Sequence, residues 1–210
     1  MIPTFSLNSS EAPTELCAIG AATHTDKSPY NDMGHRHPYT PFYTMILSQY
    51  KNKDVRFAEI GIAGSASVMM WANYFRKGSL FFFDRDMNFI NNARRIGFPN
   101  VRCHFMDVTD PESIRGALEE IGSNLDVLLD DSSHDICHQK FIIEEGLKHI
   151  RSGGMLLIED IFRNIPASAY MELIEPVKDQ LSFYCFLEME HKNKFSPGWD
   201  NDKVLMLVKN

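Results

Sequence analysis

The chain has 210 residues, of which 44% are hydrophobic, 11% aromatic and 23% charged, and its formal net charge is -7. This length suits one domain with a full core, because single cores grow to about 250 residues, and the composition excludes a largely disordered protein. The negative charge disfavours nucleic acid as a partner. The start lacks a leader-like segment, and no run of about 18 apolar residues occurs. We therefore expect a cytoplasmic protein without membrane contact.

The polar start of the chain, residues 1–20, is rich in Ser, Thr and Pro and predicts a flexible arm. We expect residues 21–210 to form a single domain. Residues 24–40 are dense in His, Tyr, Asp and Gly without periodicity, which indicates a loop. A short amphipathic helix should follow over residues 41–50.

The next part of the chain alternates apolar segments with helical patterns. The apolar segments lie at 55–60, 79–84, 101–106, 125–130 and 155–160, and the helical patterns lie at 65–76, 86–95, 111–121 and 136–150. Alternation of this kind predicts a parallel sheet, and continuously apolar strands require helices on both faces. A helix at 166–179 and two strands separated by a short polar loop end the chain, and these strands should pair antiparallel.

The predicted fold is therefore α/β, a Rossmann-like doubly wound sheet of seven strands, mostly parallel, with a C-terminal antiparallel hairpin. This order resembles that of the class I S-adenosylmethionine-dependent methyltransferases. The pattern alone also permits a nicotinamide-binding Rossmann domain, so the sites must discriminate between them.

The segment FAEIGIAGSAS, residues 57–67, joins the first parallel strand to a helix and contains Gly61 and Gly64. Doubly wound sheets bind ligands beyond the carboxyl ends of their strands, near the first strand. Glycines let the backbone approach a ligand, and a helix that begins near Ser65 presents free N–H groups. The turn predicts a cofactor site, or else only a tight corner between strand and helix.

Acidic residues accompany three successive strands. Glu59 stands two residues before the first glycine, and this E-x-G-x-x-G form is similar to methyltransferase motif I, whereas dinucleotide sites usually show G-x-G-x-x-G. The resemblance places Glu59 near the cationic amino-acid end of S-adenosylmethionine and Asp107 near its adenine. Asp84 lies about twenty residues further on, where an acid bonds ribose hydroxyls in either class of protein.

A second group of candidate residues follows the fourth and fifth parallel strands. Asp130, Asp131 and His134 lie in LLDDSSH, and Glu159 and Asp160 end LLIED. Adjacent strands lie about 4.8 Å apart, so these carboxylates should converge and repel unless a cation lies among them. Hard oxygen ligands favour Mg²⁺ or a similar divalent ion. The alternative is that these acids cap the helices that follow and face solvent.

Several segments together resemble the metal-dependent O-methyltransferases that act on macrolide sugars. These are TDK at 25–27, YTPFY at 39–43, EIGIAG at 59–64, DDSSH at 130–134 and GGMLLIED at 153–160. The resemblance implies that Asp131, Glu159 and Asp160 bind Mg²⁺ and that His134, together with Asp131, carries the catalysis, with His134 as the base. His138, one helical turn onward, is the alternative base.

The resemblance also implies a cofactor pocket shared by the loop and the strand ends. Its expected members are Thr40, Tyr43, Glu59, Gly61, Gly64, Ser65, Asp84, Asp107 and Asp130. Trp199 and Phe195, before the last strand, lie where acceptor pockets are often completed, although either could be an ordinary aromatic anchor. This chain departs from the family at Thr44, where a Glu is common, and its length leads us to expect a protein without the N-terminal domain of the larger enzymes.

The sequence thus predicts an S-adenosylmethionine-dependent, Mg²⁺-dependent O-methyltransferase whose acceptor is a hydroxyl of a sugar or another small polyhydroxy or glycosylated molecule. A catechol-type O-methyltransferase is the nearest alternative. A nicotinamide-dependent oxidoreductase and an inactive binding protein on the same fold are the others. The expected partner is a small molecule, and a homo-oligomer is compatible with the sequence.

Overall fold

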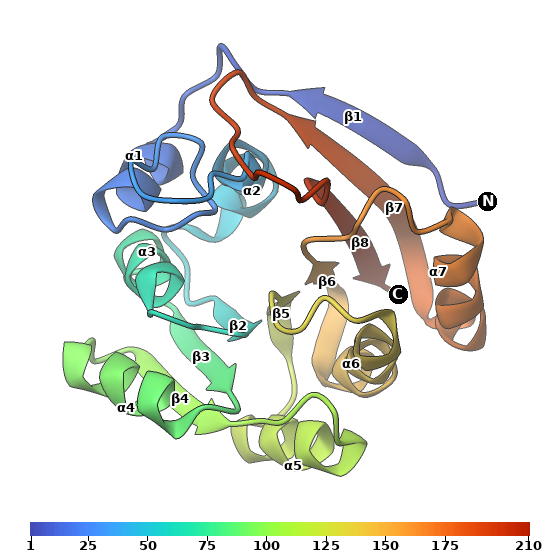
Figure 1. The fold of residues 1–210 in the computed structure, drawn as a ribbon. Coiled ribbons are helices and arrows are strands. Elements are labelled where there is room, and N and C mark those ends of the chain that lie inside the picture. Colours follow the sequence, from blue (N-terminus) through green and yellow to red (C-terminus); the bar gives the residue numbers. More distant parts are fainter.

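Eight strands form one mixed sheet in the computed structural model, which describes residues 1–210 (Figure 1). The strands are β1 (Thr4–Asn8), β2 (Arg56–Ile60), β3 (Ser79–Asp84), β4 (Val101–Phe105), β5 (Leu125–Asp130), β6 (Ile150–Ile158), β7 (Leu181–Glu190) and β8 (Lys203–Lys209). The helices are α1 (Glu15–Ala22), α2 (Tyr39–Leu47), α3 (Ala66–Tyr74), α4 (Met87–Ile96), α5 (Pro111–Ile121), α6 (Ile136–His149) and α7 (Ala167–Ile174), with 3-10 turns at Ser48–Tyr50 and Glu175–Gln180.

The strand order is β1-β7-β8-β6-β5-β2-β3-β4. Strands β6, β5, β2, β3 and β4 pair in parallel, and β8 pairs antiparallel with both β6 and β7. The chain passes from β2 to β3 on one side and returns to β5 on the other, so the order reverses beside β2. Ligands of doubly wound sheets bind at this position. The predicted class I methyltransferase fold with its C-terminal hairpin is confirmed.

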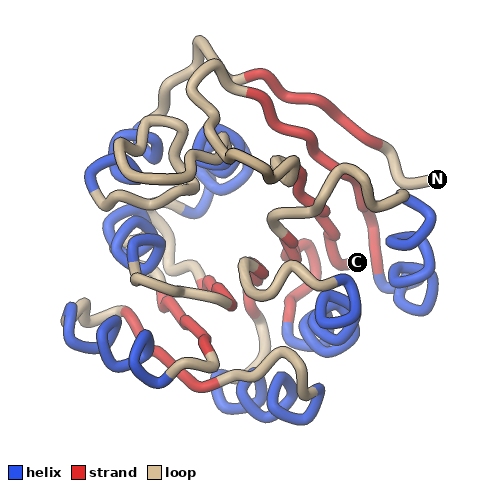
Figure 2. The backbone as a smooth tube through the Cα atoms, in the orientation of Figure 1, coloured by secondary structure: helices blue, strands red, loops and turns tan.

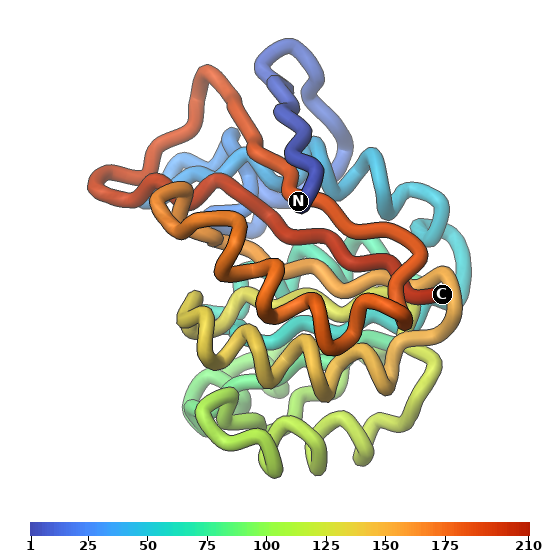
Figure 3. Tube along the Cα trace, turned by 90° about the vertical axis from the view of Figure 1, so that its right-hand side faces the viewer, coloured from blue at the N-terminus to red at the C-terminus, as the bar shows by residue number.

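Helices cover both faces of the sheet, as the continuously apolar strands require. Helices α1 to α4 pack on one face through Leu47, Trp71 and their neighbours, and Phe57 of β2 points toward them. Helices α5, α6 and α7 pack on the opposite face, where Ala58, the next residue of β2, belongs to their core. Figure 3 shows α6 and α7 side by side along the strands of the sheet.

The first twenty residues are ordered into secondary structure, so the prediction of a flexible arm is wrong and the sheet has eight strands where seven were predicted. Strand β1 pairs in parallel with β7, and the amide of Phe186 donates to the carbonyl of Pro3 at 2.8 Å. Helix α1 begins at a cap in which the Thr14 hydroxyl accepts from the amide of Cys17. Strand β1 lies at the sheet edge with mostly exposed side chains, so it carries no apolar run that sequence could reveal.

The remaining predicted elements shift by a few residues. The helix expected at 166–179 is α7 followed by a 3-10 turn, and β6 begins at Ile150, five residues before the predicted strand, across an irregularity in its pairing with β5. None of the helices combines the length and the apolar character needed to cross a bilayer.

Candidate active site

A cavity of about 520 Å³ opens at the carboxyl ends of β2, β3 and β5, beside the point where the strand order reverses. The segment between α1 and α2 closes its other side, and Figure 2 shows this loop next to the loop that precedes β8. From the strand ends the lining residues are Gly61, Ile62, Ala63, Gly64, Ala66, Ser67, Asp84, Phe89, Asp131 and Ser132, and from the loop they are His24, Thr25, Asp26, Asn31, Met33 and His35.

The turn after β2 forms the cavity wall and is held by hydrogen bonds from its neighbours. The amide of Gly61 donates to the carbonyl of Phe83 at 2.8 Å, and Oδ2 of Asp84 accepts from the amide of Ile62 at 3.1 Å. Asp84 therefore shapes the turn as well as facing the cavity. Ser65 lies at the start of α3 with φ of 68°, and its buried hydroxyl has no hydrogen-bond partner.

The two glycines of the turn have different roles. Gly61 has φ of 91°, and a Cβ there would lie 2.0 Å from the backbone carbonyl oxygen of Asp131. Gly61 is thus required for folding, because the turn passes directly against the segment after β5. A Cβ on Gly64 would meet no atom within 4 Å, and Gly64 lines the cavity. Packing alone gives no reason for a glycine at position 64.

The two substitutions to alanine should therefore separate folding from ligand binding. We expect Gly61→Ala to lower the free energy of unfolding by at least about 1–3 kcal/mol, because it combines a left-handed backbone with a backbone clash. Gly64→Ala should leave the urea unfolding curve unchanged and weaken binding of S-adenosylhomocysteine in calorimetry. Unaltered binding by Gly64→Ala would show that this glycine does not face the cofactor.

Below the cavity, Lys27 places its ammonium group among three carboxylates. Its Nζ donates to Oδ2 of Asp131 at 2.5 Å, bonds Oε2 of Glu159, and lies 3.5 Å from Oε1 of Glu59. The Lys27 side chain is 2% exposed, and Glu59 and Glu159 are fully buried. The second oxygen of Glu159 accepts from the hydroxyl of Tyr43, so this carboxylate is fully occupied. Lys27 thus joins the loop to the ends of β2, β5 and β6.

Electrostatics keeps this lysine charged. Burial by itself acts against the ammonium group, but the surrounding carboxylates, Asp131 and Glu159 foremost, outweigh it and hold the pKa of Lys27 well above its ordinary value. Burial raises the pKa of Glu59 to about 7 against the opposing effect of Lys27. Burial also raises the pKa of Asp131, and that of Glu159 more strongly. Lys27 is therefore the buried cation that balances the carboxylates of Glu59, Asp131 and Glu159.

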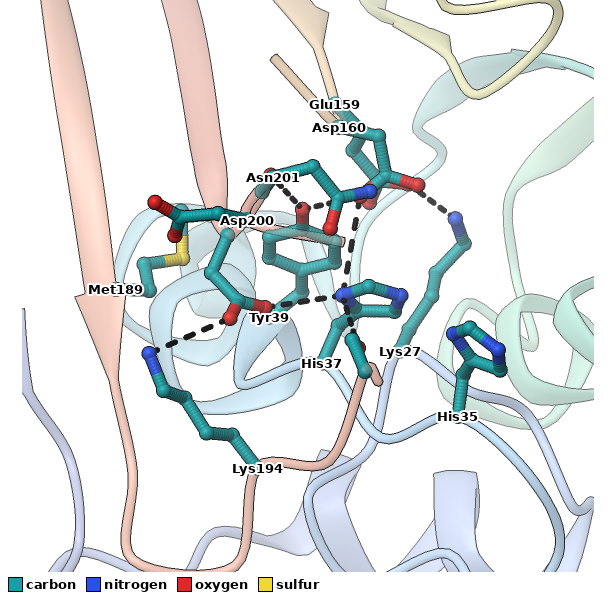
Figure 4. Close-up of polar contacts among 12 residues, drawn as sticks. Lys27, His35, His37, Tyr39, Glu159, Asp160, Met189, Lys194, Asp200 and Asn201 are labelled. Atoms are coloured by element: carbon teal, nitrogen blue, oxygen red, sulfur yellow. Dashed lines mark hydrogen bonds and ion pairs between the residues drawn. The ribbon is translucent and has the colours of Figure 1, made fainter. Parts of the chain in front are cut away.

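A second network surrounds Asp160, the last acid after β6, and Figure 4 shows it beside Lys27 and Glu159. Oδ1 of Asp160 accepts from the hydroxyl of Tyr39 at 2.5 Å, and Nδ1 of His37 lies 3.8 Å from the same oxygen. The His37 ring stacks on Tyr39 and bonds Asp202 through Nδ1 at 2.9 Å. Burial alone would lower the pKa of His37, but the bond to Asp202 and the charge of Asp160 raise it.

Asp131, His134 and Asp160 offer a possible metal site. Their nearest ligand atoms all lie within 4.8 Å of one another, and Nε2 of His134 is 3.6 Å from Oδ2 of Asp160. The two carboxylates are hard oxygen ligands that fit a divalent ion, and the imidazole of His134 lies beside them. The structure thus brings together Asp131 and Asp160 of the predicted metal set, whereas Glu159 is turned toward Lys27 and Tyr43.

The other predicted cofactor residues, Thr40, Tyr43, Asp107 and Asp130, are not among the residues that line the large cavity. Thr40 and Tyr43 are fully buried in α2, and Asp130 is buried with its carboxylate bonded to the hydroxyl and amide of Ser132. Burial raises the pKa of Asp130 to about 6. Asp107 accepts from Thr109 and belongs to neither cavity wall.

A smaller cavity of about 140 Å³ shares Gly61 and Asp84 with the large one, and it is bounded by Met106 and Val108, the neighbours of Asp107. The two cavities together follow the ends of β2, β3 and β4. His138, the alternative base, bonds the Ser133 hydroxyl through Nδ1 at 2.8 Å and lines neither cavity.

From the sequence, the loop that contains Lys27 and His37 was expected to fold over the cofactor, but neither residue was predicted to contact the acids at the strand ends, and Asp202 was given no role, although all three organise the site. Lys27 lies 104 and 132 residues from its partners Asp131 and Glu159, and His37 lies 165 residues from Asp202. The only signal was a lysine and histidines concentrated in a loop without periodicity. A loop of this composition indicates a nearby functional site, but it does not show which acidic residues its side chains contact.

No protein-family model matches the chain. The chain is 35% identical over 133 residues to L-olivosyl-oleandolide 3-O-methyltransferase of Streptomyces antibioticus, covering 60% of this chain and 33% of that protein. It is 29% identical over 193 residues to demethylmacrocin O-methyltransferase of Streptomyces fradiae, covering 83% and 47%. The chain is thus similar in sequence to O-methyltransferases whose names specify glycosylated natural products as acceptors.

A solved structure extends the similarity to the fold. The MycE methyltransferase of the mycinamycin biosynthetic pathway, in complex with Mg, SAH (S-adenosylhomocysteine) and mycinamycin VI, superposes with a TM-score of 0.69 at 20% identity, covering 95% of this chain and 55% of that one. The chain spans between 33% and 47% of the length of the curated relatives it matches. The similarity in fold thus extends over 95% of this chain.

Proposed function

We propose that this protein is an S-adenosylmethionine-dependent, Mg²⁺-dependent O-methyltransferase whose acceptor is a hydroxyl of a sugar on a small glycosylated molecule. One observation carries the proposal: Asp131 lies both on the wall of the cavity formed by the glycine turn and in the Asp131–His134–Asp160 cluster. A cofactor and an acceptor bound at these two places would be neighbours. Relatives that methylate sugars of natural products support the choice of acceptor.

The cofactor would bind against the turn after β2 and the carboxyl end of β3. Gly64 would leave room for the ligand, Asp84 on the cavity wall would bond ribose hydroxyls, and the small cavity beside Met106 would take the adenine. Glu59 lies below the cavity, where its carboxylate pairs with Lys27 and accepts a hydrogen bond from the Ser67 hydroxyl at 2.8 Å. Its predicted role near the amino-acid end of the cofactor is thus a supporting one.

The acceptor side is the cluster at the ends of β5 and β6. Asp131 and Asp160 would hold the divalent ion, which supplies Lewis-acid chemistry that lowers the pKa of a bound hydroxyl. His134 would take the proton of the acceptor hydroxyl as the O–CH₃ bond forms, and the S–CH₃ bond breaks with its electron pair left on sulfur. Tyr39 and His37 fix the Asp160 carboxylate in place, since both contact its Oδ1.

Methyl transfer with and without metal tests this function. The purified protein should transfer labelled methyl groups from S-adenosylmethionine to methyl L-rhamnoside or methyl L-olivoside, lose that activity in EDTA and regain it on addition of Mg²⁺. Transfer to catechol instead of the glycosides would reassign the acceptor, and activity that persists in EDTA would remove the metal. Binding of NAD without binding of SAH in calorimetry would reject the assignment as a methyltransferase.

A further inference from the structure

The loop between β7 and β8, residues 191–202, carries an exposed tryptophan close to the cluster. The Trp199 side chain is 47% exposed. Its ring centroid lies 6.5 Å from that of His134 and 6.1 Å from that of His35, both edge-on, and 5.5 Å from that of Phe162. His134 belongs to the Asp131–His134–Asp160 cluster and His35 lines the cavity. Trp199 is therefore next to a residue that lines the cavity and next to the proposed base.

The loop that carries Trp199 is anchored on both sides of it. Before Trp199, the backbones of Arg36 and Phe195 exchange two hydrogen bonds, of 2.8 and 3.0 Å. After it, Asp202 bonds His37 at 2.9 Å, and the carbonyl of Asn201 accepts from the Tyr39 hydroxyl at 3.1 Å, as Figure 4 shows for Tyr39 and Asn201. Figure 3 shows this loop, in red, at one end of the sheet.

An exposed indole held in this way is suited to binding a ligand. Half of its surface stays in water although a large aromatic ring gains free energy from burial. Because the loop is already fixed through Phe195, Asn201 and Asp202, a ligand that covers the ring loses little further entropy in ordering it. Tryptophans of this kind contribute more than other residues to binding surfaces.

We propose that Trp199 is the platform on which the sugar ring of the acceptor stacks. A pyranoside has an apolar C–H face that can lie against the indole, and its hydroxyl edge would then reach the neighbouring imidazole of His134. Phe162, which follows Asp160 by two residues, supports the indole from the sheet side of the site. The proposal rests on the proposed function and adds a residue that would bind the sugar ring of the acceptor.

Fluorescence tests the contact without any need for turnover, because the chain has two tryptophans and the other one, Trp71, is fully buried. Iodide should quench Trp199 and spare Trp71. Saturating methyl L-rhamnoside or methyl L-olivoside should reduce the quenching constant at least about twofold, with or without SAH. Trp199→Phe should remove the iodide response and leave the Trp71 emission in place. Quenching that neither glycoside changes would overturn the proposal.

Kinetics tests the consequence, with an exposed aromatic residue away from the site as the control. Phe183 in β7 is 42% exposed and belongs to neither cavity wall and not to the Asp131–His134–Asp160 cluster. We expect Trp199→Ala to raise KM for the glycoside about tenfold or more, with partial recovery in Trp199→Phe and with SAH affinity unchanged, whereas Phe183→Ala keeps KM near that of the unmodified protein. An unchanged KM in Trp199→Ala would overturn the proposal that Trp199 stacks on the sugar and would leave the methyltransferase assignment intact.

Failure of the unmodified protein to bind SAH would instead reject the proposed function. The iodide experiment would still decide whether Trp199 contacts the glycoside.

Discussion

Replacing Lys27 by Met should lower the free energy of unfolding by about 3–5 kcal/mol, which is typical for removal of one partner from a buried ion pair. Three buried or partly buried carboxylates, those of Asp131, Glu159 and Glu59, surround its ammonium group. Without the lysine they repel one another in a region with little water, so some must bind protons to be tolerated. The loop between α1 and α2 would also lose its connection to the strand ends.

Urea unfolding followed by circular dichroism measures this effect, and Lys192→Met is the matched control. Lys192 also pairs with an acid, Glu11 at 2.7 Å, but both side chains are more than half exposed. Exposed pairs contribute little to stability, so the control should leave the unfolding midpoint in place. If Lys27→Met changed the midpoint no more than the control, the ammonium group would not be what holds the carboxylates together.

Removal of the imidazole at position 134 should have the largest effect on the reaction. We expect His134→Ala to lower kcat by about 10²–10⁴, the usual contribution of a general base, with SAH affinity unchanged in calorimetry. His134 has φ of 56°, a conformation that asparagine tolerates better than alanine. His134→Asn, which cannot accept the proton, therefore separates the chemical loss from backbone strain and should show the same fall in kcat.

A histidine of similar exposure provides the control. The side chain of His104 in β4 is 16% exposed against 20% for His134, and it also pairs with an acid, Glu120 at 3.1 Å, but it does not belong to the Asp131–His134–Asp160 cluster. His104→Ala should keep kcat. A Mg²⁺ titration of His134→Ala then distinguishes base from ligand: activity that returns at high Mg²⁺ would assign His134 to metal binding, and unchanged activity without it would exclude both roles.

The central parallel part of the sheet was predictable because both faces of β2, β3 and β5 are buried. β3 and β5 read as continuous apolar runs, and the structure places them at the predicted residues. β1 was not predictable, because an edge strand with mostly exposed side chains shows no such run. Its pairing with β7 joins residues about 180 positions apart in the chain, and residue pattern alone does not report a contact at that distance.

Within the candidate site, residue type and strand order determined which groups come to one edge. Gly61, Asp84, Asp131 and Asp160 follow strands that point the same way, so a parallel sheet must bring them together. The sequence could not distinguish the functions of Gly61 and Gly64, since a glycine has the same backbone freedom at either position. Only the backbone of the segment after β5, in contact with Gly61 and distant from Gly64, distinguishes them.

By itself, then, the sequence determined the fold and the strand ends that carry acids, because periodicity and residue type are local properties. The tertiary structure alone decided that Glu159 faces Lys27 and Tyr43 while its neighbour Asp160 faces His134 and Tyr39. Two successive residues beyond a strand point in different directions, and the loop and helix of residues 24–47 determine what each of them meets.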